Sequence, residues 1–261
     1  MGRRLGQHFL FDPAILDRIV DAMDPHPADQ VVEIGPGKGT LTQRLAPRVG
    51  RVVAIERDGA LAEEIRTTAP VNCRVIHGDA LEVDWHAQLP EPPPAAPYKV
   101  AGNIPYAITT PLIDKALTEP LPASITFLVQ REVAERLGAA PGSKAYGALS
   151  VGVQAVAVVE RLFAVRAGSF RPPPKVDSAV VRLTPRSEPL TTAEEREPFR
   201  RFVTGLFGQR RRQLVRALRT VTDLPAAGVA DLVAALGVDP AARPEVLTPQ
   251  EFVDLFRLQP R

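Results

Sequence analysis

The chain has 261 residues, a net charge of +2 and a hydrophobic fraction of 45%, ordinary values for a folded globular protein. This charge alone does not indicate a nucleic-acid partner, but arginines gather near the N-terminus and again at residues 210–219. The single cysteine, Cys73, excludes an internal disulfide framework; we expect it to be buried, in a reducing compartment. The sequence has neither an apolar run that could span a bilayer nor a signal peptide, so we expect a cytoplasmic protein without membrane association.

Short apolar runs alternate with helical stretches over the first 138 residues. A helix is expected over 12–23, where Asp12 and Pro13 supply the cap and the first helical position. Strands are expected at residues 31–34, 52–55, 73–76, 99–101 and 125–129. Helices are expected at residues 40–47, 59–68, 109–118 and 130–138. This alternation is typical of an α/β fold with a parallel sheet and crossover helices.

The pattern changes in the second half of the chain. After a helix over 145–156, strands at 158–165 and 179–183 flank the turn-rich segment Phe170–Pro174 and predict an antiparallel hairpin at the sheet edge. Beyond Ser187 only helices are expected, at residues 193–207, 209–220, 226–236 and 249–257. We therefore expect two domains, 1–187 and 188–261. The proline-rich segment 90–94 predicts a stiff surface loop in preference to a partner-binding motif.

A glycine-rich loop, Glu33 to Gly39, begins in the first of these strands. A buried strand that leads through glycines into a helix is typical of a nucleotide-cofactor site, because glycine adopts positive φ and lets the backbone approach a ligand. Thr40 stands where a dinucleotide-binding loop has its last glycine, which disfavours NAD. The loop also lacks the lysine-serine ending of the NTPase phosphate loop.

Acidic residues end the next two strands. Glu56 follows the loop by about 20 residues, the spacing expected of an acid that accepts from both hydroxyls of a ribose. Asp79 ends the third strand and can accept from an adenine amine. Each acid alone would be a helix cap or a solvated charge. Their order at successive strand ends favours a cofactor site.

Asn103-Ile104-Pro105-Tyr106 follows the fourth strand. The amide oxygen of Asn103 and a backbone carbonyl near Ile104 can accept the two N6 hydrogens of adenine, whose amine is a poor nucleophile. Pro105 stiffens the turn, and Tyr106 can stack on the base. Alone this would be an asparagine-initiated turn. Beside a cofactor loop it predicts methyl transfer driven by positioning, with no metal or covalent nucleophile.

Other reactive groups do not form a recognisable site. The histidines have no metal-ligand spacing with Cys73, so no metal centre is expected. Ser143 and Ser178 lack the glycine context of a nucleophile elbow.

These motifs together resemble one family, the KsgA-type small-subunit rRNA adenine dimethyltransferases, over nearly the whole chain. An Asn-Ile-Pro-Tyr turn alone is shared by amino-methyltransferases, whereas the full series is specific. The matching blocks are Gly6–Leu10, Glu33–Gly37, Glu56, Gly78–Ala80, Asn103–Tyr106, Ser143–Gly147, Phe170–Val180, Gln209–Arg212 and Gly237–Arg243.

The resemblance implies a Rossmann-like seven-stranded class I methyltransferase sheet with a small all-helical C-terminal domain. It implies S-adenosylmethionine as methyl donor and N6,N6-dimethylation of two adjacent adenosines in the 3′-terminal hairpin of 16S rRNA. The implied cofactor contacts are His8, Leu10, Gly35, Gly37, Glu56, Asp79, Ala80 and Asn103. His8 departs from the asparagine often found there, but an imidazole still donates or accepts. The implied catalytic residues are Asn103, Ile104, Pro105 and Tyr106, with Phe170 either a second stacking partner for the flipped base or a core aromatic.

An arginine cluster without acids predicts the RNA contacts. Its members, expected to meet phosphates, are Arg210, Arg211, Arg212, Arg216 and Arg219. The alternative is a solvated helix face. Arg3 and Arg4 are further candidates. We expect a monomer that reads small-subunit rRNA by shape within a pre-30S-like particle.

Three other functions compete with this interpretation. A large-subunit rRNA methyltransferase of the antibiotic-resistance type would share the loop and the turn, but Phe170–Val180 and Gly237–Arg243 favour the small-subunit type. A non-catalytic methyltransferase-like assembly or transcription factor would not need the intact acids and Asn103. An NAD-dependent oxidoreductase is disfavoured by the glycine spacing.

Overall fold

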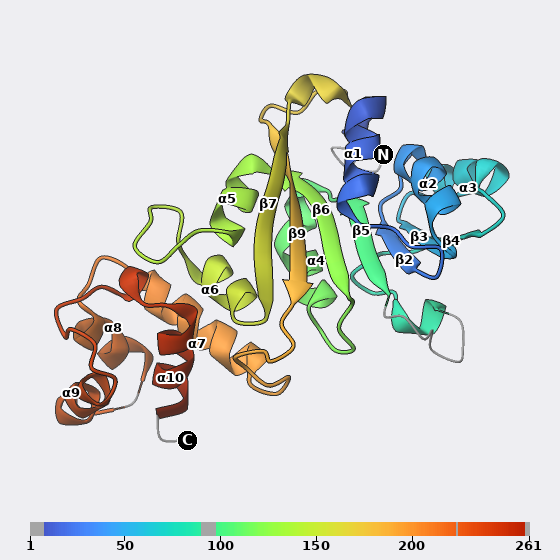
Figure 1. Cartoon of the computed structure of the whole chain (residues 1–261). Coiled ribbons are helices and arrows are strands. Elements are labelled where there is room, and N and C mark those ends of the chain that lie inside the picture. The colour runs from blue at the N-terminus through green and yellow to red at the C-terminus, as the bar shows by residue number, and fades with distance from the viewer. Residues whose placement is uncertain (1–7, 90–97, 223, 259–261) are drawn as a thin grey trace. The chain divides into compact units, whose positions relative to one another are not determined.

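The computed structural model describes residues 8–89, 98–222 and 224–258. Its central sheet has seven strands in the order β4-β3-β2-β5-β6-β9-β7 (Figure 1). In chain order these are β2 (Gln30–Ile34), β3 (Arg51–Glu56), β4 (Cys73–His77), β5 (Lys99–Asn103), β6 (Ser124–Gln130), β7 (Ala157–Val165) and β9 (Ser178–Pro185). The expected seven-stranded α/β fold is confirmed.

The chain forms two compact units. The first contains the described residues up to Ala134 together with Glu160–Pro185, and the second contains Glu135–Val159 and the residues from Arg186 onward. The second unit thus takes in residues 135–159 in addition to the segment after the expected boundary. A functional division at residue 187 stays a prediction.

Five neighbouring strands, β4, β3, β2, β5 and β6, run parallel, and every residue of β2 is buried. Parallel strands covered on both faces are predominantly apolar, which is why the sequence predicts β2, β3, β5 and β6, whereas β4 is only partly buried. The helices of the first unit and the one that crosses its boundary are α1 (Pro13–Ala22), α2 (Thr40–Leu45), α3 (Gly59–Thr68), α4 (Thr109–Ala116) and α5 (Arg131–Leu137). Short 3₁₀ turns are η1 (Ala46–Arg48), η2 (His86–Gln88), η3 (Tyr106–Ile108) and η4 (Ala167–Ser169).

Helix α1 begins where the sequence predicts. The Asp12 carboxylate caps it by accepting from the backbone N–H groups of Ala14 and Ile15, and Pro13 is its first residue. Its apolar side packs into the core of the first unit through Leu16, Ile19 and Val20.

Cys73, expected to be buried, is half-buried against the same core, and burial raises the pKa of its thiol to about 12.

The end of the sheet carries the expected hairpin. Strand β9 pairs antiparallel with β6 and lies between β6 and the edge strand β7, which runs in the opposite direction to β9 (Figure 1). A second, two-stranded sheet was not predicted: β1 (Phe9–Leu10) pairs antiparallel with β8 (Phe170–Arg171). Strands of two residues are too short to show an alternating pattern.

The second unit is helical apart from the start of β7. Its described elements are α6 (Ala148–Gln154), α7 (Arg196–Gly208), α8 (Leu214–Val221), α9 (Ala226–Ala235), η5 (Pro244–Val246) and α10 (Pro249–Leu258). The helix expected over 145–156 is shorter. The helix expected over 209–220 begins only at Leu214, because residues 209–213 form turns that close the end of α7.

Some expectations lie outside the described residues, namely those for Arg3, Arg4, Gly6, Gln7 and the proline-rich segment 90–94. In the described part of the chain, no helix combines the length and apolar character needed to cross a membrane. The same residues contain no cluster of His, Cys, Asp and Glu suited to a metal ion.

Candidate active site

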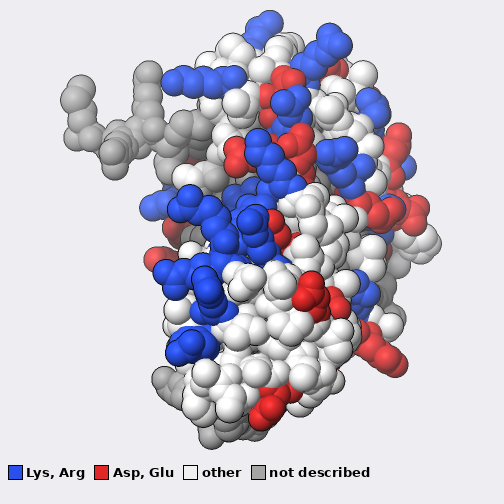
Figure 2. Space-filling view, turned by 90° about the vertical axis from the view of Figure 1, so that its left-hand side faces the viewer, with Lys and Arg blue, Asp and Glu red and all other residues white. Residues whose placement is uncertain are grey.

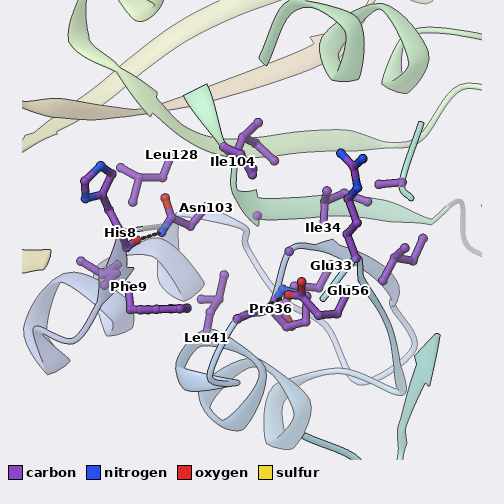
Figure 3. A pocket seen from close by; sticks show the side chains of 18 of the residues that line it. His8, Phe9, Glu33, Ile34, Pro36, Leu41, Glu56, Asn103, Ile104 and Leu128 are labelled. Atoms are coloured by element: carbon purple, nitrogen blue, oxygen red, sulfur yellow. Dashed lines mark hydrogen bonds between the residues drawn. The ribbon is translucent and has the colours of Figure 1, made fainter. Parts of the chain in front are cut away.

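A cavity opens in the first unit where β2, β3 and β5 end (Figure 3). Open α/β sheets bind ligands at this edge, since the loops that leave neighbouring parallel strands separate there. All the predicted cofactor and catalytic residues except Phe170 line the cavity: His8, Leu10, Gly35, Gly37, Glu56, Asp79, Ala80, Asn103, Ile104, Pro105 and Tyr106.

The glycine loop has a backbone that side chains would strain. Gly35, Gly37 and Gly39 have φ of 63°, 58° and 72°, which is the left-handed region. A Cβ on Gly37 would also lie 2.9 Å from the Phe9 ring. The loop therefore presents bare backbone to the cavity, as a ligand in close contact requires.

Glu56 joins the loop to the end of β3. Its side chain accepts from the backbone N–H of Gly37 at 3.0 Å through one oxygen and from that of Asp58 at 2.9 Å through the other. The residue is only 4% exposed, and this burial raises its pKa, although the backbone hydrogen bonds act in the opposite direction. Each oxygen keeps a further lone pair, so the carboxylate can still accept from two neighbouring hydroxyls.

Glu33 lies at the end of β2 as a buried acid that the sequence did not reveal. It lines the cavity, is 1% exposed, and accepts a 2.7 Å hydrogen bond from the Thr42 hydroxyl. Burial raises its pKa to about 7; the Thr42 hydrogen bond opposes this shift and the charge of Glu56 adds to it. The sequence places Glu33 in the expected strand 31–34, but no motif there assigns its carboxylate a role in the cavity.

Asp79 is held on two sides at the end of β4. One carboxylate oxygen accepts from the backbone N–H of Leu81 at 2.9 Å, and the other lies 3.4 Å from the Arg57 guanidinium. Ala80 is buried, and its carbonyl accepts from the Trp85 indole at 2.8 Å. Arg57 also lines the cavity. The sequence does not predict a role for Arg57, because a lone arginine after an acid forms no recognisable motif.

Asn103 is oriented by the N-terminal segment. Its amide nitrogen donates to the His8 carbonyl at 2.8 Å (Figure 3), and its amide oxygen has no partner among the described residues. Ile104 is 1% exposed, and its backbone N–H donates to the Leu128 carbonyl at 3.1 Å. The turn thus offers the cavity a fixed hydrogen-bond acceptor.

Tyr106 stands beside this acceptor as a half-buried ring. Its centroid is 5.8 Å from that of His8, whose Nδ1 lies 2.8 Å from the Pro172 carbonyl. Its hydroxyl lies 2.8 Å from the Ser178 hydroxyl, and burial raises its pKa. The ring is therefore held at its far end as well as by the backbone.

Phe170 does not line the cavity, and its expected role as a second stacking partner stays a prediction. Its side chain is 2% exposed and belongs to the hydrophobic core that includes Leu16 and Val180. Its pairing with Leu10 in the small sheet keeps it there. The alternative interpretation, a core aromatic, describes its position.

The five arginines expected to meet phosphates divide into two kinds. Arg210 is half-buried: its guanidinium lies 2.6 Å from the Glu245 carboxylate and donates to the Lys144 carbonyl at 3.1 Å. These contacts give Arg210 a structural role, and its expected contact with phosphate stays a prediction. The other four are exposed, at residues 211, 212, 216 and 219.

Helix α8 presents its arginines away from its apolar face. Leu214, Ala217 and Leu218 are buried, whereas Arg216 and Arg219 are exposed. Figure 2 shows a face on which Lys and Arg side chains gather with few acids among them. Such a surface suits a polyanion.

Comparison with known proteins gives a consistent result. Residues 2–259 match the family model described as ribosomal RNA adenine dimethylase. Ribosomal RNA small subunit methyltransferase A of Xanthomonas campestris pv. campestris (strain B100) is 43% identical over 260 residues, which cover 98% of this chain and 95% of that protein. The protein of the same name from Geobacter metallireducens is 40% identical over 259 residues, with coverages of 98% and 94%.

Solved structures extend the likeness to three dimensions. A dimethyladenosine transferase from Plasmodium falciparum superimposes with a TM-score of 0.82 at 28% identity, covering 95% of this chain and 96% of that one. The 23S rRNA methyltransferase ErmE superimposes with a TM-score of 0.72 at 29% identity, with coverages of 96% and 98%.

Proposed function

Since the chain belongs to the ribosomal RNA adenine dimethylase family and is thus an S-adenosylmethionine-dependent rRNA methyltransferase, we propose that it dimethylates two adjacent adenosines in the 3′-terminal hairpin of 16S rRNA. The choice of the small subunit is supported by the names of relatives at 40% and 43% identity, against 29% for the large-subunit enzyme ErmE. The observation that carries the chemistry is the Asn103 amide, whose nitrogen is bound to His8 and whose oxygen is left for a substrate amine.

The cavity residues fit the cofactor. The Glu56 carboxylate can accept from two ribose hydroxyls, and Asp79, ion-paired with Arg57, can accept from an adenine amine. The positive φ of Gly35 and Gly37 leaves room for close backbone contact, and His8, Leu10, Ala80 and Asn103 complete the proposed contacts. When bound, S-adenosylmethionine supplies a methyl group activated by the positive charge on its sulfur.

Asn103 and Tyr106 prepare the adenine amine. Two acceptors, the Asn103 amide oxygen and the Ile104 backbone carbonyl, would bind its two hydrogens, which favours the pyramidal form with a free lone pair. Pro105 keeps the turn rigid, and the Tyr106 ring would stack on the base. These residues act by positioning the base in a preorganised polar site, and none of them forms a covalent bond with it.

The RNA contacts would come from the exposed arginines of the C-terminal region, residues 188–261. Arg211, Arg212, Arg216 and Arg219 are free to meet phosphates, while Arg210 supports the turn between α7 and α8. We further propose a monomer that acts in the cytoplasm on a pre-30S-like particle.

A single experiment tests substrate and position together. The protein is incubated with labelled S-adenosylmethionine and, separately, unmethylated small and large ribosomal subunits, and methylated adenosines are mapped by mass spectrometry. We expect dimethylation of two neighbouring adenosines in the small-subunit hairpin. Label in the large subunit alone would reassign the substrate, and cofactor binding without label would indicate an assembly factor.

A matched variant tests the site. Asn103→Ala should abolish methylation while binding to the subunit persists, because the side chain touches the reacting amine and no phosphate. Loss of binding together with activity would contradict this role.

A further inference from the structure

Ser178 reaches the active-site edge of the sheet because its strand runs backwards. Asn103, at the carboxyl end of β5, pairs with Leu128 of β6, and Gln130 of β6 pairs with Ser178. Since β9 is antiparallel to β6, its first residue lies where the parallel strands end. A residue 75 positions after Asn103 thereby arrives beside the catalytic turn.

The Ser178 hydroxyl has one described partner, the Tyr106 hydroxyl at 2.8 Å. Ser178 is fully buried, whereas Tyr106 is half-buried and lines the cavity. A buried hydroxyl requires a hydrogen-bond partner, and this one satisfies that need with a cavity residue rather than with its own backbone. The hydrogen bond connects the rigid sheet to the ring expected to hold the base.

The backbone at the start of β9 is itself fixed. The Asp177 carbonyl accepts from the backbone N–H of Arg131 at 3.0 Å, and the Asp177 carboxylate accepts from that of Ala167 at 3.0 Å. Tyr106, by contrast, belongs to the short 3₁₀ turn η3. The contact therefore holds a residue of a short turn against a residue of the sheet.

We propose that Ser178 is a positioning residue for methylation: its hydroxyl fixes the position of the Tyr106 ring beside Asn103. This rests on the proposed function, because it assumes that Tyr106 stacks on the target base. A ring held only at Cα can rotate about two side-chain bonds. A hydrogen bond at the phenol oxygen restricts the swing about the Cα–Cβ bond, because that rotation would move the oxygen, so the base meets a ring held in a fixed position.

The test compares wild type, Ser178→Ala, Tyr106→Phe and the double variant, with kcat and KM measured on small subunits. Each single change should lower kcat by about three- to tenfold, the factor expected for one net hydrogen bond. The double variant should be no slower than the slower single variant, since both changes remove the same contact. The KM for S-adenosylmethionine should not change. Ser178→Thr, which keeps the hydroxyl, should restore most of the activity.

Thr126→Val is the matched control, because it also removes a buried hydroxyl from the same sheet, one that has no partner among the described residues. It should leave kcat unchanged. A wild-type kcat in Ser178→Ala, or losses that multiply in the double variant, would overturn the proposal.

A second measurement does not depend on turnover. Urea unfolding of the same four proteins gives the coupling between the two hydroxyls, and additive losses of stability would refute the contact. If wild type labels no small-subunit RNA, the proposed function fails, and the reaction role of Ser178 fails with it. Coupling in unfolding would then show that the contact exists for another purpose.

Discussion

Gly37→Ala separates backbone strain from loss of the cofactor site. Gly37 has φ of 58°, so an alanine there should cost about 1–2 kcal/mol of unfolding free energy from left-handed strain alone. The new methyl would also lie 2.9 Å from the Phe9 ring. Phe9 is half-buried, so its ring can rotate away, and the overlap should disturb the cavity more than the stability.

Gly142→Ala is the matched control for this change. Gly142 also has positive φ, at 81°, but a Cβ there meets nothing within 4 Å, and the residue does not line the cavity. Both variants should lose similar stability in urea titrations. Only Gly37→Ala should weaken S-adenosylmethionine binding, by about tenfold for a loss of about 1.4 kcal/mol. Calorimetric titration measures the affinity, and equal affinities in the two variants would refute the assignment of the loop.

Three further predictions concern the buried acid, the arginines and the first helix. Burial raises the pKa of Glu33 from 4.5 to about 7, so the free energy of unfolding should fall as pH rises from 4.5 to 7. Glu33→Gln should remove roughly 3 kcal/mol of that fall, measured by urea titrations at pH 4.5 and pH 8. The same pH dependence in the variant and the wild type would contradict the burial of this charge. Arg216→Ala should weaken subunit binding and reduce the slope of log affinity against log salt concentration by about one, whereas Arg210→Ala should lower the melting temperature. The reverse pattern would contradict the assignment of Arg216 to phosphate and of Arg210 to structure. Asp12→Ala should cost about 1 kcal/mol of unfolding free energy, and Asp12→Asn, which keeps an acceptor, should cost much less.

The sequence predicts the parallel strands well because most of their residues are apolar, and recognisable residues stand at the ends of β2, β3, β4 and β5. Glu56, Asp79 and Asn103 could be placed together because each stands at or just after the end of such a strand, and parallel strands end at one edge. Helix α1 was placed by its cap. The sequence signals that predict these elements are local, because each depends on residues within a few positions of one another.

The sequence is less informative where distant residues meet. Phe170 is in the core because β8 pairs with β1, more than 150 residues earlier in the chain. Arg210 looked like a free charge because its partner, Glu245, is 35 residues away and lies in no shared motif. The Leu214 start of α8 reflects turns at the end of α7 that helix propensity does not anticipate. Composition and periodicity contain no information on such pairings.

The N-terminal segment shows why these distant contacts matter for chemistry. The Leu10 carbonyl accepts from Thr40 at the start of α2, the Phe9 ring covers Gly37, and the His8 carbonyl orients Asn103. Three consecutive residues therefore contact both the proposed cofactor loop and the proposed acceptor for the substrate amine. Because one short segment, His8 with strand β1, contacts both proposed sites, a substitution that displaces it should alter cofactor binding and amine positioning together. The Ser178 contact reaches only Tyr106, so the two kinds of variant should differ in whether KM for the cofactor changes along with kcat.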